Sequence, residues 1–436
     1  MKKFVSLFLA LVMVFCATAS LAEIEITTEE ITLTYVSCDE DYELTCALAD
    51  QFEEKYPNIT VEVLEMDSST YVESLSNLAA EQKLPDVFWM DNVCDAVANG
   101  WALLLDDFYA NDPDAQMISQ SILDVAQIRG KRFSVPAKSR PIIAVVNKTV
   151  FDQYNMELPD PDWTWEDFVQ IAEEIAHPED YVFGYGNNMT VEYWMPRHEY
   201  DGNSYTMGET WQMLEETFAD WRVRGIAENM TADEKIAVLG DAGAYPFSAI
   251  NLQSSIWGAA GFIDGSMAQQ TGCEFLIYPV PGPMNTNPDE TWFACISKGT
   301  KYPNEAWELA KWMNWNKEAH LLRNKWYQEN EIVQFALPLI DDEDVWADTK
   351  ARALPSMETF YNHVKPLAPR IDPHAPAILW VNVMFYFGGV PQKFANGETT
   401  PADIAPQLRE EYNGYMEDWF VGIPEFATAT DLDVTE

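Results

Sequence analysis

The chain has 436 residues and a formal net charge of −45, from 71 acidic and 26 basic side chains. So negative a chain repels nucleic acid and anionic lipid, which argues against both as partners and favours neutral or cationic ones. The alternative, which we prefer, is that the acidic faces only keep the protein soluble. Its length is sufficient for two domains, each with a hydrophobic core of its own.

The N-terminus has the pattern of an export signal. Lys2 and Lys3 precede an apolar run from Phe4 to Phe15, and Ser20-Leu21-Ala22 offers small residues for cleavage. The apolar run is shorter than the ~20 residues that span a bilayer. We therefore predict a signal peptide over residues 1–22, cleaved near Ala22, and an exported protein in the periplasm or outside the cell envelope. Cys16 raises the alternative of a lipid anchor, which the bulky Phe15 before it disfavours.

Residues 31–92 predict three strands separated by two helices. Residues 31–36 are rich in β-branched side chains, and apolar residues then recur every four positions through Tyr56. Apolar residues alternate from Ile59 to Val63, and a second helical pattern runs from Tyr71 to Ala79. This alternation is typical of a parallel sheet with right-handed crossovers.

The predicted strand ends carry the first candidate site residues. Ligand sites in parallel α/β sheets lie at the carboxyl ends of the strands, and Trp89 and Asp91 come at the end of the third one. There they would supply a ring face and a hydrogen-bond acceptor; the alternative is a core tryptophan and a helix-capping aspartate. Asp39, after the first strand, is open to the same two interpretations.

The region from Phe133 to Val146 predicts a connection between two lobes. Two short apolar runs bracket Lys138 and Arg140 there. A guanidinium near such a hinge can donate to several ligand hydroxyls, which we expect of Arg140, whereas for Lys138 we prefer pairing with a carboxylate.

Later segments add local signals. Thr164 and Asp167 have capping-box spacing, and Pro401 follows Thr400 as expected at a helix start. Strands are predicted over residues 275–283 and 291–297, followed by a helix capped by Asn304. Cys273 and Cys295 flank these strands, so a disulfide between them is possible, although sequence cannot decide pairing.

Taken in order, these segments resemble the extracellular solute-binding proteins that feed ABC importers, in the carbohydrate-binding group that includes maltose-binding protein. The matching segments are residues 52–61, 84–88, 130–136, 146–148, 164–168 and 397–401. Two departures are the absence of a lipoprotein box and the sequence of residues 240–245.

The resemblance implies a fold class and a domain division. The fold is the α/β, periplasmic-binding-protein-like class, in which two α/β lobes are joined by crossing hinge strands around a ligand cleft. It implies an N-lobe of residues 23–140 and 291–340, and a C-lobe of residues 147–290 and 341–436 that ends in an acidic tail.

The resemblance also implies a function. The protein would be a monomer that captures a mono- or oligosaccharide by hinge closure and delivers it to the permease subunits of an ABC importer. It places Trp194 and Trp380 among the rings of the second lobe that face the cleft. Trp257 is a further candidate on which core packing and ligand contact are evenly balanced, and core packing is the alternative for all three.

Signals of catalysis are missing from the sequence. It contains no nucleophile elbow, zinc-binding helix or phosphate loop, and its five histidines lack metal spacing. We therefore expect neither enzymatic activity, nor a cofactor, nor a metal. The rival hypothesis is a secreted glycoside hydrolase, which needs two carboxylates about 5–9.5 Å apart. No pattern singles out such a pair. Another exported carbohydrate-binding protein, such as an adhesin, is the remaining alternative.

Overall fold

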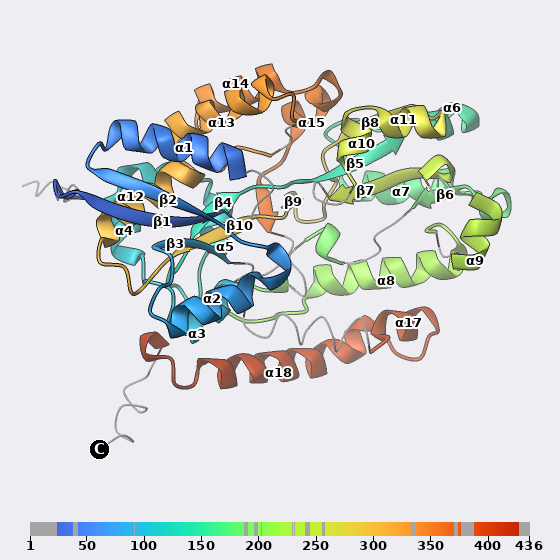
Figure 1. Ribbon diagram of the computed structural model, residues 1–436. Helices are drawn as coiled ribbons and strands as arrows, with labels where there is room; N and C mark the ends of the chain where they lie inside the picture. The colour runs from blue at the N-terminus through green and yellow to red at the C-terminus, as the bar shows by residue number, and fades with distance from the viewer. Residues whose placement is uncertain are drawn as a thin grey trace, which may run out of the picture.

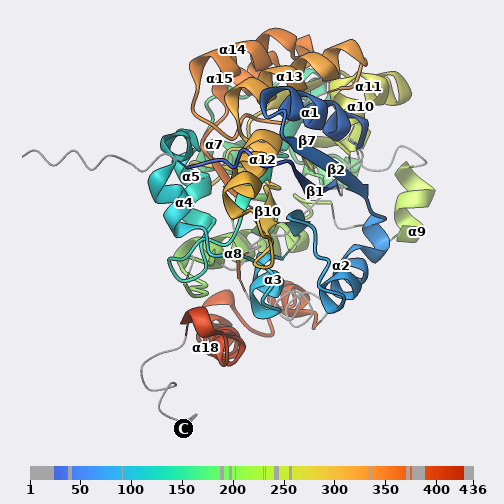
Figure 2. The same ribbon diagram turned by 60° about the vertical axis from the view of Figure 1, so that its left-hand side comes forward.

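The computed structural model describes residues 24–37, 42–90, 92–186, 191–195, 199–201, 203–228, 230, 232–239, 245–254, 258–333, 336–369, 374–375 and 388–426. These residues form two main sheets with helices packed around them (Figures 1 and 2). The larger sheet and its helices are called the first lobe here, and the smaller sheet and its helices the second lobe.

The sheet of the first lobe has five strands in the order β2-β1-β3-β10-β4. Its strands are β1 (Ile31–Ser37), β2 (Ile59–Glu65), β3 (Val87–Met90), β4 (Val135–Lys138) and β10 (Trp292–Ile296). β1 runs parallel to β2 and β3, as the alternation of strands and helices predicted. β10 comes from a distant part of the chain and inserts antiparallel between β3 and β4.

Helices of the first lobe bury the apolar faces of this sheet. α1 packs on β2 and on α12, and α12 crosses β3, β10 and β4. The apolar spacing that predicted α1 places Leu44, Leu48 and Phe52 in the core. The helices are α1 (Tyr42–Lys55), α2 (Tyr71–Ala80), α3 (Val93–Ala98), α4 (Asp106–Asn111), α5 (Gln120–Val125), α12 (Pro303–Asn314), α13 (Lys317–Glu329) and α14 (Glu343–Arg352).

The sheet of the second lobe has four strands in the order β6-β7-β5-β8. They are β5 (Ile142–Asn147), β6 (Phe183–Tyr185), β7 (Ser248–Ser254) and β8 (Phe275–Tyr278). The associated helices are α6 (Lys148–Tyr154), α7 (Trp165–Ile175), α8 (Glu209–Arg224), α9 (Ala232–Glu234), α10 (Ala260–Ile263), α11 (Ser266–Thr271), α15 (Glu358–His363) and α17 (Val390–Ala395). The predicted capping box at the start of α7 is confirmed, since Thr164 and Asp167 bond each other's backbone N–H.

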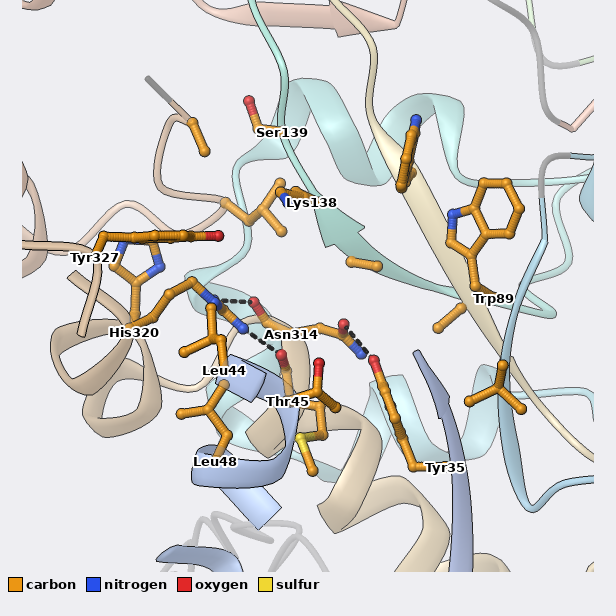
Figure 3. A pocket seen from close by; sticks show the side chains of 18 of the residues that line it. Tyr35, Leu44, Thr45, Leu48, Trp89, Lys138, Ser139, Asn314, His320 and Tyr327 are labelled. Atoms are coloured by element: carbon orange, nitrogen blue, oxygen red, sulfur yellow. Dashed lines mark hydrogen bonds between the residues drawn. The ribbon is translucent and has the colours of Figure 1, made fainter. Parts of the chain in front are cut away.

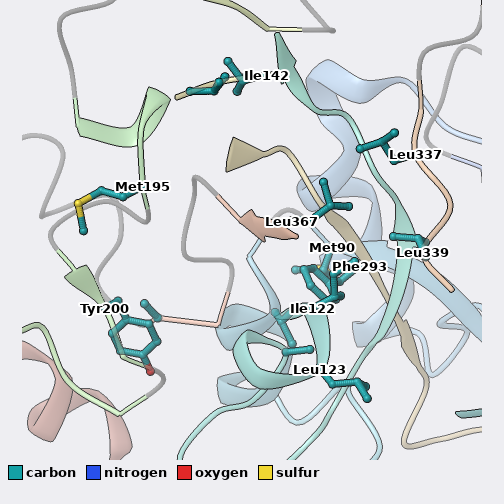
Figure 4. Close-up of a cluster of buried hydrophobic side chains, with 14 of the residues drawn as sticks. Met90, Ile122, Leu123, Ile142, Met195, Tyr200, Phe293, Leu337, Leu339 and Leu367 are labelled. Atoms are coloured by element: carbon teal, nitrogen blue, oxygen red, sulfur yellow. The ribbon is translucent and has the colours of Figure 1, made fainter. Parts of the chain in front are cut away.

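Two described segments run from one sheet to the other and are called the crossings here; the link from α14 to α15 also passes between the lobes. The first leaves β4 and enters β5 through Ser139, Arg140 and Pro141. The second runs from β9 (Asn287–Asp289) into β10, and β9 pairs in parallel with β11 (Leu367–Pro369). β11 also packs on α5 of the first lobe. Near this junction Met90 pairs with Phe293 within a buried apolar cluster (Figure 4). The crossings are therefore anchored in well-packed surroundings.

The C-terminal helix α18 (Pro401–Phe420) touches both lobes. It packs on α8, and Asn413 exchanges two hydrogen bonds with the backbone of Tyr205. At its other end Phe420 lies under the guanidinium of Arg129, 3.7 Å from ring centroid to Cζ. Glu425, just beyond the helix, pairs with Lys298 at 2.6 Å. Figure 1 shows α18 running beneath both lobes.

The predicted lobe boundaries stay predictions, because strand membership alone does not fix them. α14, which follows the predicted boundary at residue 340, packs against α13. None of the helices that the structure describes combines the length and the apolar character needed to cross a membrane. Residues 1–23, including the predicted signal peptide and Cys16, lie outside the described part of the chain.

Candidate functional site

A pocket opens at the carboxyl edge of the first sheet, beside the first crossing. It encloses about 820 Å³ of space, part of which is open to solvent. Tyr35, Trp89 and Lys138 reach it from the carboxyl ends of three parallel strands (Figure 3). Trp292 reaches it from the start of the antiparallel β10. This is the edge on which the sequence predicted a ligand site.

Trp89 contributes an indole ring to this pocket. The ring is partly buried, with its centroid 5.3 Å from that of Tyr71 and 4.9 Å from that of Trp292. The Tyr71 hydroxyl donates to the carbonyl oxygen of Trp89 at 2.7 Å, which fixes the end of the strand. The indole N–H is buried and finds no acceptor among the described residues. Trp89 thus offers an aromatic surface to the pocket, and contacts with Tyr71 fix its position.

Trp292 was not predicted as a site residue. It is partly buried and lines the same pocket, with its ring tilted by 56° to that of Trp89. The sequence placed it inside a strand but gave no sign that this strand would lie next to β3. Only the pairing of Ala294 with Trp89 brings the two rings together.

Arg140 lies in the first crossing, behind the pocket wall. Its side chain is almost completely buried, and its guanidinium carbon lies 4.3 Å from the centroid of the Trp292 ring. The Arg140 carbonyl accepts from the N–H of Glu290, so the two crossings are bonded to each other here. Arg140 lies at the hinge, where the sequence placed it, but its guanidinium faces the Trp292 indole.

A second set of polar side chains lines the other end of the pocket. The Tyr35 hydroxyl bonds Asn314 Oδ1 at 3.3 Å, and Arg323 donates to backbone carbonyls at the end of α12. His320 and Tyr327 lie near each other at this end (Figure 3). Burial lowers the pKa of His320 to about 3, so the imidazole is neutral at pH 7. Apart from Tyr35 of β1, these residues come from α12 and α13, for which the sequence gave no site signal.

Trp194, a predicted ring of the second-lobe wall, is fully buried in the structure. Its ring contacts Trp165, Phe168 and Tyr185 with centroid distances of 4.7 to 5.6 Å. This is the packing expected under the core alternative. Asp39, Asp91, Trp257 and Trp380 lie outside the described residues, so their roles stay predictions.

No metal site and no disulfide is found within the described part of the chain. No group of three or more His, Cys, Asp or Glu side chains there could hold an ion. Cys273 and Cys295 are both free thiols: Cys295 lies within β10 of the first sheet, and Cys273 lies just before β8 of the second. The disulfide that their positions allowed is therefore not formed.

Comparison with known proteins places this architecture among proteins of one kind. A family model described as bacterial extracellular solute-binding protein matches residues 47–352. A sugar transporter from Rhizobium etli in an open conformation is 17% identical, with 88% of this chain and 99% of that one covered and a TM-score of 0.68.

Two further solved structures show the same likeness. The cyclic alpha-maltosyl-1,6-maltose binding protein from Arthrobacter globiformis is 15% identical, covering 89% of this chain and 99% of that one, with a TM-score of 0.66. An ABC substrate-binding protein from Listeria monocytogenes, in complex with cycloalternan, is 17% identical, covering 89% and 100%, with a TM-score of 0.59. At such identities the likeness concerns the fold, and the predicted fold class is confirmed.

Proposed function

Because this chain belongs to the bacterial extracellular solute-binding proteins, we propose that it captures a carbohydrate in the pocket beside Trp89 and delivers it to an ABC importer. The family resemblance predicted from the sequence is confirmed by the match over residues 47–352. The family and the similar structures are binding proteins; the absence of catalytic activity in this chain is part of the proposal.

The observation that carries the proposal is the pair of partly buried indole rings at one pocket. Trp89 and Trp292 present aromatic surface next to the polar groups of Tyr35, Lys138 and Ser139. A pyranose sugar has an apolar face of C–H groups and a rim of hydroxyls. Ring faces suit the first, and charged or hydroxyl side chains suit the second, so the pocket has both kinds of group that a sugar requires.

The ligands of the similar structures support the same class of ligand. They are cycloalternan in the Listeria monocytogenes protein, maltotetraose in a cyclo/maltodextrin-binding protein and maltose in a Staphylococcus aureus protein. The chain aligns with each of these proteins over most of its length. We infer a mono- or oligosaccharide for this protein too, without a choice of linkage.

The capture step that we propose is a hinge motion around the two crossings. A ligand held by both lobes favours the closed arrangement by the difference in its affinity for the two arrangements. In this proposal Asp39, Trp89 and Asp91 contact the ligand from the first lobe, and Trp257 and Trp380 contact it from the second. Arg140 acts from the hinge, through the Trp292 ring that its guanidinium faces. The protein works as a monomer that the permease subunits recognise.

Isothermal titration calorimetry against a glycan panel tests the ligand class. The panel contains maltose, maltotetraose, cycloalternan, xylo-oligosaccharides and tagatose, with amino acids and a dipeptide as controls. We expect saturable heat with at least one glycan and none with the controls. A carbohydrate ligand would be contradicted if only a control compound gave saturable heat, or if no compound did. A reducing-end assay on the same glycans should stay at background, because release of new ends would indicate a hydrolase.

A further inference from the structure

Trp292 sits at a point where the pairing of its strand changes. The register of β10 with β4 shifts between Trp292, which pairs with Lys138, and Phe293, which pairs with Pro136. An irregularity of this kind locally twists a strand and re-aims a side chain, and such irregularities occur often beside functional sites. Phe293 is fully buried, whereas the Trp292 ring is partly exposed at the pocket.

The Trp292 ring is held by groups from two other segments. Trp89 of β3 lies 4.9 Å from it between ring centroids, and the Arg140 guanidinium carbon lies 4.3 Å from its centroid. A buried cation over an indole face is among the stronger cation–π arrangements. Arg140 is 5% exposed and is not among the residues that line the pocket, whereas the Trp292 ring that its guanidinium faces does line it.

We infer that Trp292 is a second stacking ring of the ligand site and that Arg140 is a positioning residue that holds this ring in place. The inference rests on the proposed function and adds to it the way in which the Trp292 ring is held by Arg140. A ring that is already ordered before the ligand arrives loses less side-chain entropy on binding, which increases affinity.

The position of the pair on the crossings adds a mechanical consequence. Trp292 is the first residue of β10, three positions after the end of β9 in the second crossing, and Arg140 belongs to the first crossing. A ligand that stacks on Trp292 therefore touches the hinge itself and not only the wall of one lobe. Ligand binding in the pocket and the conformation of the two crossings therefore influence each other through the Trp292 ring.

The first test is substitution of the ring. Trp292→Ala should weaken binding of the first glycan that gives heat with the wild-type protein by about tenfold or more, because aromatic anchors dominate such sites. Trp292→Phe should recover part of that loss. Trp419→Phe on α18, away from the pocket, is the matched control and should bind like wild type. Unchanged affinity in a folded Trp292→Ala variant would overturn the inference.

A double-mutant cycle tests the positioning role of Arg140. Arg140→Met should weaken glycan binding several-fold when Trp292 is present and have no further effect in the Trp292→Ala background. Arg140→Lys, which keeps the charge but loses the planar group, should fall between wild type and Arg140→Met. An equal loss in both backgrounds would mean that Arg140 acts on the ligand directly, which overturns the positioning role. Thermal melting of each variant checks that the protein remains folded.

These outcomes are separate from a failure of the proposed function. A wild-type protein that binds no glycan of the panel contradicts carbohydrate capture itself. A wild-type protein that binds a glycan, with a Trp292→Ala variant that binds equally well, leaves capture intact and rejects only the role of Trp292.

Discussion

The hydroxyl of Ser139 donates a 2.6 Å hydrogen bond to Asp289, which joins the two crossings inside the protein. Asp289 also accepts from the Thr291 hydroxyl, and its side chain is completely buried. The carboxyl group therefore ties a residue of the first crossing to the strand that begins the second. Together with the bond from the Glu290 N–H to the Arg140 carbonyl, it holds the two crossings side by side.

Burial of Asp289 predicts a pH dependence of stability. Burial raises the pKa of Asp289 from 3.8 to about 7, although its hydrogen bonds with Ser139 and Thr291 partly oppose the shift. Between these two values the folded state keeps a proton that the unfolded state has lost, so this group's contribution to stability falls as the pH rises. Asp289→Asn should remove the dependence.

Urea unfolding of the wild type and of Asp289→Asn between pH 4.5 and pH 8 measures this effect. The wild type should lose stability relative to the variant as the pH rises, by an amount on the order of a few kcal/mol over the range. Parallel profiles of the two proteins would show that the carboxyl group ionises in the folded protein as it does in the unfolded chain.

Two buried histidines predict the opposite dependence at acid pH. Burial lowers the pKa values of His320 and His374 from 6.5 to about 3. Below pH 6.5 the unfolded state takes up protons at these rings while the folded state does not, so stability falls as the pH falls towards 3. His320→Gln should reduce the slope by up to about 1.4 kcal/mol per pH unit.

Chemical unfolding at pH 4 to pH 7 gives the slopes to compare. The His320→Gln and His374→Asn variants should each be less acid-sensitive than the wild type, and the double variant less sensitive than either. His374 accepts from or donates to the Ser134 hydroxyl at 2.8 Å, so His374→Asn also tests whether a smaller polar group suffices there. Slopes equal to that of the wild type would contradict the assignment of neutral, buried rings.

An internal ion cluster in the first lobe predicts a large loss of stability on removal of one partner. Lys311 Nζ lies 2.9 Å from Asp112 and 2.8 Å from Glu308. Burial alone would lower the pKa of Lys311, but these carboxylates outweigh it and the pKa is raised. Lys311→Met leaves Asp112 buried without its cation, although Trp307 still donates to it. We expect a loss of about 3–5 kcal/mol in the free energy of unfolding.

An exposed ion pair of the same kind is the control for Lys311. Lys83 and Glu81 are 2.9 Å apart, with 68% and 62% of their side chains exposed. Lys83→Met should change the free energy of unfolding by less than about 1 kcal/mol, because exposed pairs are solvated and screened. Equal effects of the two substitutions in urea melts would show that burial of Asp112 does not matter.

Trp89 predicts a loss of ligand binding without loss of the fold. Trp89→Ala removes a partly exposed ring from the pocket but leaves the hydrogen bond from Tyr71 to the backbone of residue 89 possible. Glycan affinity should fall by about tenfold or more, whereas the melting temperature changes little. Calorimetry and thermal melting give the two numbers. Undiminished binding by a folded variant would exclude Trp89 from the site.

Local patterns were enough to predict many elements from the sequence. Side-chain spacing within about ten residues predicts strands β1 to β3, helices α1 and α2 and the capping box of α7. Such spacing depends only on neighbours along the chain, so it can be read from the sequence. The helix start after Thr400 is another such case, with the Thr400 hydroxyl accepting from the N–H of Asp403. One detail differs: Pro303 begins α12, so Tyr302 and not Asn304 is the N-cap residue.

The pairing of distant strands was beyond what the sequence could predict. β10 lies between β3 and β4 although about 200 and 150 residues separate it from them, and no local pattern specifies such a partner. For this reason Trp292 was missed, while Trp89 at the end of an early strand was found. Trp194 was selected through family resemblance, which does not distinguish a ring in the cleft from a ring packed below it.

The C-terminal helix α18 bears on how far the lobes can turn. A helix that contacts both lobes restrains their relative rotation: the lobes keep their angle unless the contacts at one end of the helix break. One group of contacts is the pair of Asn413 with Tyr205. The second group is Phe420 with Arg129, and Glu425 with Lys298. The second group consists of an ion pair and a cation–ring contact. Salt screens such charges, so a higher salt concentration would weaken this group and let the two lobes rotate more freely.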